Sequence, residues 1–436
     1  MNLHALALAR IERGENPVRV GLIGAGKFGS MFLNQAPTSP LEVTAIADLD
    51  LGRARAACRT VGWEDELIER VNFVEDGKEL CARDDVDVVL EVTGSPPAGI
   101  AHARAAFANG KPIVMVNVEA DVLAGPLLAR EAQSAGVVYS MGYGDQPALV
   151  CELVDWARAA GFDVVSAGKG TKYLPSFHAS TPDTVWDHYG LSAAQAEQAG
   201  MNPQMFNSFL DGTKSGIEMT AIANATGLSP APDGLGFPDV PTDELQNKLI
   251  PAEDGGLLHH KGQVEVISSL FRDGGEIPND LRWGVYVVFE APNDYAKDCF
   301  AQYGLKTDPS GRYSALYRPY HLIGLELGIS ALSAVLRHEP TGQTRGFVSD
   351  VVCVAKRDLS EGEILDGEGG FTVWGKVQPA AKSLRLGALP IGLAHQVRLT
   401  RGVKEGEIVR WDDVLVDETM EAVKTRRAME QAFSQP

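Results

Sequence analysis

The sequence predicts an α/β fold: a doubly wound parallel Rossmann sheet, an inserted α+β substrate domain and a small β-rich C-terminal module. Three observations predict it. Apolar strand-like segments alternate with helix-like segments over residues 18–142. A glycine-rich turn, residues 24–29, follows the first apolar segment. Beyond residue 150 the alternation stops, and loops rich in Gly, Pro and Asp occupy 229–262.

The alternating part of the chain defines the predicted parallel sheet. Helices are expected between its strands, including 102–111 and 127–136. The strands are apolar throughout, as a sheet covered on both faces requires. We expect five of them, at 18–23, 41–48, 85–94, 112–117 and 137–142.

The change of rhythm along the chain predicts its division into domains. In the substrate domain, 163–170, 283–291 and 313–322 resemble strands, and the apolar helix 323–337 could pack back on the Rossmann sheet. The four expected segments are an N-terminal helix (1–15), a dinucleotide-binding domain (16–150), an α+β substrate and oligomerisation domain (151–344) and a β-rich domain with a tail (345–436).

Composition narrows the class of partner. The 436 residues are 44% apolar and 22% charged, which is ordinary for a soluble globular protein. With 39 basic and 58 acidic residues, the net charge of −19 argues against nucleic acid and anionic membranes, but not against a small anionic substrate. No run of 18 apolar residues occurs, and the five cysteines form no CxxC pair. We therefore expect a cytoplasmic protein.

The glycine-rich turn is the strongest local motif. Gly24 permits a tight turn, Gly26 lets the backbone approach a pyrophosphate, and Gly29 allows close packing of helix on strand. Lys27 and Phe28 belong to the same turn. Because the turn follows a predicted strand and opens a predicted helix, it predicts a nicotinamide dinucleotide site.

The end of the second strand bears on the choice of cofactor. Asp48 lies 19 residues after Gly29, where a carboxylate binds the ribose 2′-hydroxyl. A carboxylate there repels a 2′-phosphate, so it favours NAD over NADP. Arg53 and Arg55 could offset this charge, although an exposed helix face is the favoured interpretation of both.

Later strand ends supply candidates for the nicotinamide half of the site, because ligands bind at the carboxyl ends of parallel strands. Thr93, Gly94 and Asn117 are expected near the cofactor. Glu119 and Asp145 follow strands four and five as candidate catalytic carboxylates. The alternative for both acids is the start of the next helix, as a cap or a first-turn acid.

The substrate domain adds a second set of polar residues. Residues 167–172, which include Lys169 between two glycines, end an expected strand as a loop able to hold a phosphate or carboxylate, or as a solvated turn. Lys214 leads into an expected apolar helix that carries Glu218, where a carboxylate is costly to bury unless it is paired or functional. Lys169, Lys214 and Glu218 are candidate catalytic residues. The expected substrate-binding residues are Lys172, Asp211, Asn224, Arg318 and His321.

These blocks resemble the homoserine dehydrogenase family over residues 16–337. That family is implied to carry a strand-end Asn-Lys pair and a second lysine on the helix that follows the substrate aspartates. The matching positions here are Glu119, within Asn117-Val118-Glu119, and Glu218, so an acid replaces each lysine.

A fuller resemblance is to the deoxyxylulose-phosphate reductoisomerase-like family, a homoserine-dehydrogenase-like group with a C-terminal SAF domain. It is carried by GENPVRVGLIGAG, MVNVEADV, GYGDQP, VVSAGKG, DGTKSGIEMTAIANATGL and RPYHL, with VAKRDLSEGEIL and TRGVKEGEI in the SAF-like part. It implies an NADPH-dependent reductoisomerase that acts on a ketose phosphate in isoprenoid synthesis. Because Asp48 favours NAD, the chain could be a paralogue with another substrate.

Two chemical schemes and three functions follow. Glu119, Asp145 and Glu218 could hold Mg²⁺ or Mn²⁺, or Lys169 could polarise the substrate carbonyl while an acid acts as the general base. The first function is a reductoisomerase of a phosphorylated keto-sugar. The alternatives are an NAD-dependent dehydrogenase of a polyol, hydroxy acid or amino acid, and a non-catalytic nucleotide-binding scaffold. A homodimer or homotetramer is expected.

Overall fold

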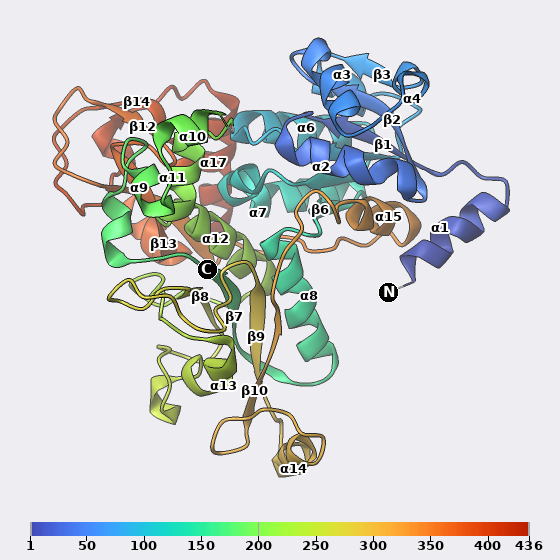
Figure 1. Cartoon of the computed structure of the whole chain (residues 1–436). Helices are drawn as coiled ribbons and strands as arrows, with labels where there is room; N and C mark the ends of the chain where they lie inside the picture. Colours follow the sequence, from blue (N-terminus) through green and yellow to red (C-terminus); the bar gives the residue numbers. More distant parts are fainter. Residues whose placement is uncertain (1, 199, 435–436) are drawn as a thin grey trace. The chain divides into compact units, whose positions relative to one another are not determined.

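The computed structural model describes residues 2–198 and 200–434 (Figure 1). The chain forms two compact units. Unit 1 comprises Met1–Glu152 and His321–Arg345, and unit 2 comprises Leu153–Tyr320 and Gly346–Pro436. Residues 346–436 therefore belong to the same compact unit as the middle of the chain, whereas the sequence predicts a separate domain from residue 345.

Unit 1 contains a six-stranded parallel sheet in the order β3-β2-β1-β4-β5-β6. This is the strand order of a doubly wound dinucleotide-binding sheet, so the predicted fold class is confirmed. One strand, β3, was not expected from the sequence. The strands are β1 (Val18–Ile23), β2 (Leu41–Ala47), β3 (Asn72–Val74), β4 (Val88–Glu91), β5 (Ile113–Met115) and β6 (Tyr139–Met141).

Helices cover both faces of this sheet. On one face, α1, α2 and α15 share an apolar core with the alternate residues Val18, Val20 and Leu22 of β1. On the other face, α5, α6 and α7 contact the strands. The helices are α1 (Leu3–Glu12), α2 (Lys27–Gln35), α3 (Leu51–Thr60), α4 (Asp65–Glu69), α5 (Gly77–Cys81), α6 (Pro96–Ala108), α7 (Val118–Ala135) and α15 (Gly328–Leu336), while α8 (Gln146–Ala159) leads into unit 2.

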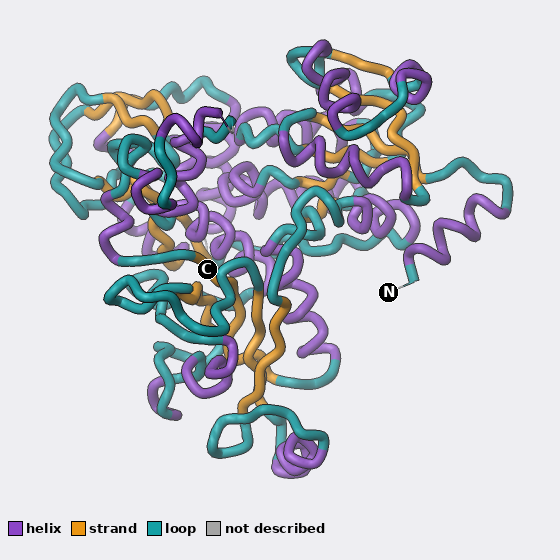
Figure 2. The backbone as a smooth tube through the Cα atoms, viewed as in Figure 1, coloured by secondary structure: helices purple, strands orange, loops and turns teal. Residues whose placement is uncertain are grey.

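Unit 2 is built on a mixed sheet in the order β10-β9-β7-β8, in which only β7 and β8 run parallel. Figure 2 draws the strands of the chain in orange, the helices in purple and the loops in teal. Its strands are β7 (Asp163–Thr171), β8 (Gln263–Ser268), β9 (Val285–Glu290) and β10 (Tyr313–Arg318). The helices of this part are α9 (Val185–Tyr189), α10 (Ala193–Gln198), α11 (Pro203–Leu210), α12 (Thr213–Thr226), α13 (Leu245–Lys248) and α14 (Asp294–Gln302).

The C-terminal module, residues 346–436, contains two small antiparallel sheets. One pairs β11 with β13, and the other has the order β12-β14-β15. Its elements are β11 (Ser349–Ala355), β12 (Ile364–Asp366), β13 (Val373–Pro379), α16 (Ala380–Leu386), β14 (His395–Leu399), β15 (Val414–Leu415) and α17 (Glu421–Phe433).

Helix α12 joins the module to the mixed sheet. It contacts β7 and β8 as well as β11 and β13. Every residue of α12 except Lys214 is buried. A Cβ at Gly216 would lie 2.9 Å from the Gly375 carbonyl oxygen, so the β11–β13 pair approaches α12 closely. The module is therefore part of the core of unit 2.

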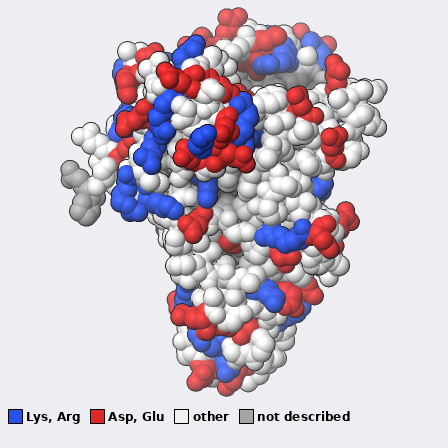
Figure 3. Space-filling model, turned by 90° about the vertical axis from the view of Figure 1, so that its left-hand side faces the viewer, with Lys and Arg blue, Asp and Glu red and all other residues white. Residues whose placement is uncertain are grey.

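Charge on the face drawn in Figure 3 is mixed, with Lys and Arg interspersed among Asp and Glu. Among the described residues, no helix is both long enough and apolar enough to cross a membrane.

A buried ion pair inside the module yields a stability prediction. The Arg426 guanidinium of α17 pairs with the Asp350 carboxylate of β11 at 2.5 Å, and both side chains are fully buried. Arg426→Ala leaves that carboxylate without its cation, so we expect the free energy of unfolding to fall by about 3–5 kcal/mol. Lys424→Ala, an exposed change on the same helix, is the control. Urea unfolding measures both, and equal small losses would contradict the prediction.

Candidate active site

The glycine-rich turn has the local geometry that its sequence predicts. Gly24 has a φ of +101° and donates its amide to the Ala47 carbonyl at 2.8 Å. A Cβ at Gly29 would lie 2.3 Å from the Gly24 carbonyl oxygen, so only glycine allows α2 to pack this closely on the turn. Gly26, by contrast, is exposed, and a Cβ there meets no atom within 4 Å. Space beside Gly26 is what a bound pyrophosphate requires.

Lys27 and Phe28 form the first turn of α2. Lys27 is exposed and Phe28 is half-buried. The amides of this first turn have no partners within the helix, which makes them available to an anion at the helix N-terminus.

Asp48 is buried and engaged with the turn. Its Oδ2 accepts a hydrogen bond from the Ala25 amide at 2.9 Å, and its Oδ1 accepts from the Asp50 amide at 3.0 Å. Arg53 donates to the same Oδ1 at 2.6 Å. Burial alone would raise the pKa of Asp48, but these hydrogen bonds hold it below its ordinary value. Asp48 therefore anchors the glycine turn as a charged group.

Arg53 is exposed on α3, as the favoured interpretation predicts, and it also pairs with Asp48. The Arg53 side chain is 62% exposed but spends one nitrogen on Asp48, so it does offset that negative charge. Arg55 instead lies over the Phe73 ring, 4.0 Å from its centroid. Helix α3 thus places one arginine beside the predicted ribose carboxylate, with much of its guanidinium accessible to a 2′-phosphate.

The loops after β4 and β5 are tied together by Asn117. Its side-chain amide donates to the Ser95 carbonyl at 2.8 Å, and its oxygen accepts from the Ala120 amide at 3.1 Å as the N-cap of α7. Thr93, which is exposed, donates to Glu91 at 2.5 Å. Gly94 is exposed with a φ of +71°. Asn117 therefore holds the loop that presents Thr93 and Gly94.

The two strand-end acids both stand at helix starts. Glu119 lies half-buried in the first turn of α7. Asp145 directly precedes α8 and accepts the Gln146 amide at 2.8 Å. Both positions suit an acid near the positive end of a helix dipole, which is the alternative that the sequence left open.

The central pair of unit 2 is Lys169 with Glu218. The Lys169 ammonium on β7 forms an ion pair with Glu218 on α12, and each side chain is 7% exposed. The glycine-lysine-glycine segment is therefore part of strand β7, and the expectation of a loop is wrong. A Cβ at Gly168 or Gly170 would come within 2 Å of a backbone carbonyl, that of Glu265 or Leu281. The strand needs glycine on both sides of the lysine because neighbouring backbone approaches so closely.

The other predicted cations differ in their burial and in their contacts. Lys172 is half-buried and donates to the His188 carbonyl at 2.6 Å, and its burial lowers its pKa. Lys214 is the half-buried residue of the first turn of α12, four residues before Glu218 and so on the same side of the helix. Arg318 ends β10 and lies 5.1 Å from the centroid of the Tyr320 ring. His321 belongs to unit 1.

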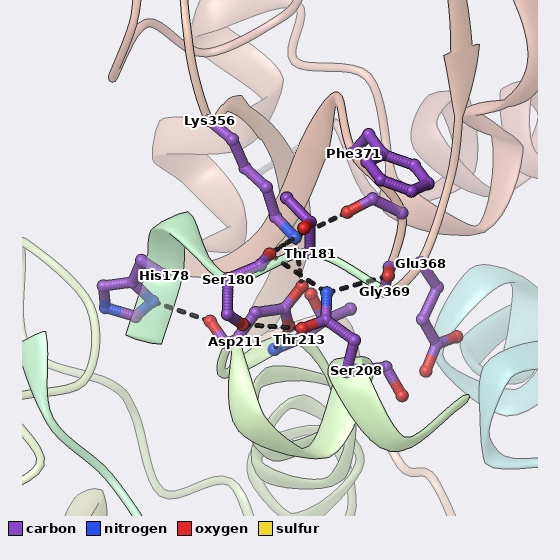
Figure 4. A network of polar contacts seen from close by, with 12 residues as sticks. His178, Ser180, Thr181, Ser208, Asp211, Thr213, Lys356, Glu368, Gly369 and Phe371 are labelled. Carbon is purple, nitrogen blue, oxygen red and sulfur yellow. Dashed lines mark hydrogen bonds and ion pairs between the residues drawn. The ribbon is translucent and has the colours of Figure 1, made fainter. Parts of the chain in front are cut away.

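Two residues expected to bind substrate, Asp211 and Asn224, contact the C-terminal module. Asp211 is fully buried, and its carboxylate lies 2.8 Å from the Lys356 ammonium of the C-terminal module (Figure 4). Lys356 also donates to the Ser180 and Gly370 carbonyls, both at 2.7 Å. Asn224, at the other end of α12, accepts the amides of Val348 and Ser349. Both residues join the module to α12, and substrate binding by either of them stays a prediction.

Sequence reasoning missed two buried acids. Burial raises the pKa of Asp121 in α7 to about 6, although Thr344 and Tyr139 donate hydrogen bonds to it. Burial likewise raises the pKa of Glu265 in β8 to about 7, despite four hydrogen-bond donors. For Glu265 the available signal was a single acid inside an otherwise apolar segment, whereas Asp121 follows Glu119 by two residues and had no such signal.

The donor set does not fit the predicted metal ion. Glu218 is occupied by Lys169, and Asp145 accepts a backbone amide at a helix start. Within residues 2–198 and 200–434, no group of three His, Cys, Asp or Glu side chains is placed to hold a metal ion. No step of the reaction is therefore assigned to a divalent cation.

Two family models match consecutive parts of the chain. Residues 18–143 match the Gfo/Idh/MocA model, described as "Oxidoreductase family, NAD-binding Rossmann fold". Residues 144–327 match a model described as "Oxidoreductase DRL, catalytic domain". Residues 18–143 are therefore similar to an NAD-binding Rossmann domain of the Gfo/Idh/MocA oxidoreductase type, and residues 144–327 are similar to an oxidoreductase catalytic domain.

Curated relatives match over the shorter part of their length. An inositol 2-dehydrogenase from Acidothermus cellulolyticus is 31% identical over 123 residues, which are 28% of this chain and 34% of that protein. A homoserine dehydrogenase from Neisseria gonorrhoeae is 31% identical over 111 residues, which are 23% of each chain. The chain thus spans about a third and about a quarter of the two relatives.

Solved structures match at lower identity. A probable dehydrogenase from Thermotoga maritima is 16% identical with a TM-score of 0.39, covering 74% of this chain and 90% of that one. A myo-inositol dehydrogenase from Lactobacillus casei, in complex with NAD(H) and myo-inositol, is 19% identical with a TM-score of 0.28, covering 39% and 50%.

The different surroundings of the two glycines separate folding from cofactor binding. Gly26→Val fills open space, so we expect unchanged stability but NADH affinity lowered by about tenfold or more, because the side chain occupies the pyrophosphate position. Gly29→Ala forces a Cβ against the Gly24 carbonyl, so we expect lower thermal stability. Fluorescence titration with NADH and thermal unfolding measure the two effects. Unchanged NADH affinity in Gly26→Val would exclude the predicted pyrophosphate site.

Proposed function

We propose that this protein is an NAD(P)-dependent oxidoreductase that interconverts a carbonyl and a hydroxyl group on a small anionic substrate. The observation that carries the proposal is the buried Lys169–Glu218 ion pair, which lies in the segment similar to an oxidoreductase catalytic domain. Unpaired buried charges are costly, so a strand lysine facing a helix glutamate in an apolar setting points to retained chemistry.

Unit 1 supplies the residues that would hold the cofactor. The turn from Gly24 to Gly29 and the first amides of α2 suit the pyrophosphate, and the exposed Thr93 and Gly94 follow β4 at the same edge of the sheet. When bound, the nicotinamide cofactor supplies or accepts the hydride. Because Arg53 neutralises Asp48, we propose that NAD is accepted and that NADP is tolerated.

The ion pair also suggests the source of the proton that the reaction requires. In the reducing direction the carbonyl oxygen gains an electron pair as its carbon receives a hydride, and that oxygen requires a proton. The Lys169 ammonium is the proposed donor, and the Glu218 carboxylate pairs with it and orients it. In the oxidising direction the neutral amine takes the hydroxyl proton. The reaction thus balances as one hydride and one proton.

The cations of unit 2 favour an anionic substrate. Lys214 lies on the same side of α12 as Glu218, and Lys172 and Arg318 stand at the ends of β7 and β10. Lysine and arginine are the usual partners of phosphate and carboxylate groups. A phosphorylated or carboxylated compound is therefore the proposed substrate class.

A second candidate is a reductoisomerase of a keto-sugar phosphate. It rests on the sequence resemblance, whose quoted segments between residues 142 and 322 overlap residues 144–327, a segment similar to an oxidoreductase catalytic domain. Product analysis distinguishes the candidates: a rearranged carbon skeleton supports the reductoisomerase, and an unchanged skeleton supports the plain dehydrogenase. The relatives that act on inositol and homoserine make polyols and hydroxy amino acids further compounds for the same screen.

The ion pair yields a direct test once turnover of a substrate is found by nicotinamide absorbance. Lys169→Met and Glu218→Gln should each lower kcat by about 10²-fold or more and change NADH affinity by less than about twofold, because they remove the proton donor or its partner. Lys261→Met, which breaks an exposed lysine–carboxylate pair on the same sheet, should retain full turnover.

Stability needs its own control, because one charge left buried destabilises the fold by about 3–5 kcal/mol. The double variant Lys169→Met with Glu218→Met removes both charges and should melt closer to the unmodified protein than either single methionine variant. It should remain inactive. Normal turnover by this folded double variant would exclude the proposed role of the pair.

Chelation provides an independent prediction. Because the Lys169 ammonium, rather than a metal ion, neutralises Glu218, exhaustive treatment with EDTA should leave kcat within about twofold of its starting value. Added Mg²⁺ or Mn²⁺ should not raise it. A loss of turnover on chelation that Mg²⁺ restores would return the three-carboxylate metal site to consideration.

A further inference from the structure

A large cavity lies at the edge of unit 1 opposite the glycine turn. Its volume is about 1020 Å³, which is at the upper end for small-molecule sites. Its walls include residues at or just before the starts of parallel strands, such as Arg19 of β1, Asp87 before β4 and Pro112 before β5. The predicted cofactor site is formed at the carboxyl ends of these strands, so the cavity is separate from it.

The charge of this cavity runs against that of the whole chain. Five basic side chains and two acidic ones line it, an excess of three positive charges in a protein of net charge −19. A concave surface of one sign concentrates ions of the opposite sign. The basic residues are Arg10, Arg19, Lys111, Arg130 and Arg345, and the acidic ones are Asp84 and Asp87.

Within the described part of the chain, ion pairs and hydrogen bonds leave some N–H donors of the cavity without a protein acceptor. The Asp87 carboxylate forms ion pairs with Arg19 at 2.6 Å and with Arg10 at 3.5 Å. The Arg19 Nε is buried, and among the described residues it has no hydrogen-bond partner. Lys111 spends one hydrogen on the Val86 carbonyl at 2.8 Å, which leaves two of its three N–H donors. For Arg345, the described residues provide no hydrogen bond or ion pair, and its side chain is exposed at the cavity.

The rest of the lining is suited to the carbon skeleton of an organic ligand. Apolar residues from several parts of the chain, among them Val86, Val138 and Val335, line the cavity together with the charged ones. The wall also includes His338, whose φ of +56° is a left-handed conformation uncommon for a residue with a side chain. A site with apolar walls and a few convergent cations is typical of pockets for small organic anions.

We propose that this cavity is a second ligand site, which binds a small organic oxyanion carrying two or more negative charges. The cations supply charge-assisted hydrogen bonds to phosphate or carboxylate oxygens, and the apolar residues contact the carbon body. Because the site lies at the opposite edge of the sheet from the glycine turn, its ligand is distinct from the cofactor and from the substrate of the proposed reaction.

Calorimetric titration of the full chain, saturated with NADH, tests this site. The two probes are citrate, a polycarboxylate, and fructose 1,6-bisphosphate, a bisphosphate. We expect at least one to bind, with affinity falling as ionic strength rises. The matched variants are Arg345→Glu, which lines the cavity, and Arg337→Glu, an exposed arginine of the same unit that does not. Arg345→Glu should weaken binding by about tenfold or more, and Arg337→Glu by less than about twofold.

The outcomes distinguish a carboxylate ligand from a phosphate ligand, and binding in the cavity from binding in the cofactor site. Selective binding of citrate assigns a carboxylate ligand, and selective binding of the bisphosphate assigns a phosphate ester. Lys111→Met repeats the test at a second wall of the cavity and should also weaken binding. No heat of binding from either probe, or equal weakening by the two arginine variants, would overturn the proposal. Because NADH already fills the cofactor site, displacement of NADH by the probe would also overturn it.

Discussion

The complete enclosure of helix α12 is the constraint on which unit 2 depends. Strands β7 and β8 contact it, as do β11 and β13 of the C-terminal module, so only Lys214 of its fourteen residues escapes burial. Each charge in such surroundings must have a partner. Glu218 takes Lys169 from the mixed sheet, and Asp211, just before the helix, takes Lys356 from the module. The same burial that fixes the helix therefore fixes both ion pairs.

This arrangement changes the expected part played by the C-terminal module. The sequence places its start near residue 345, outside the cofactor and substrate domains. In the structure it completes the surroundings of the helix that carries Glu218, through Lys356 at one end and the Asn224 hydrogen bonds at the other. A truncation at 345 would strip one side of a buried helix. The module therefore supports α12, the helix that carries Glu218 of the proposed proton-transfer pair.

The parallel sheet could be predicted because its signals are local. Apolar strand runs and the glycine turn each require only neighbouring residues, and unit 1 follows them except for the three-residue strand β3. Partners distant in sequence left no such signal. Lys169 was expected in a loop because it lies between two glycines. The reason for these glycines is visible only in the fold, where the backbone of Glu265 and Leu281 approaches strand β7 closely. The ion pair of Asp211 could not be predicted, because its partner Lys356 lies 145 residues further along the chain.

Strand-end acids show why spacing alone left the site ambiguous. The carboxyl end of a parallel strand is also the start of the next helix, so a ligand-binding acid and a capping acid occupy the same sequence position. Glu119 and Asp145 meet both descriptions. Glu218 does not, because it lies inside a buried helix and nothing about the helix itself requires an acid there. The resemblance to homoserine dehydrogenases implies a lysine at this position of the helix, where this chain has Glu218. Strand β7 places the Lys169 ammonium beside that carboxylate, and this contact is the basis for proposing Lys169 as the proton donor.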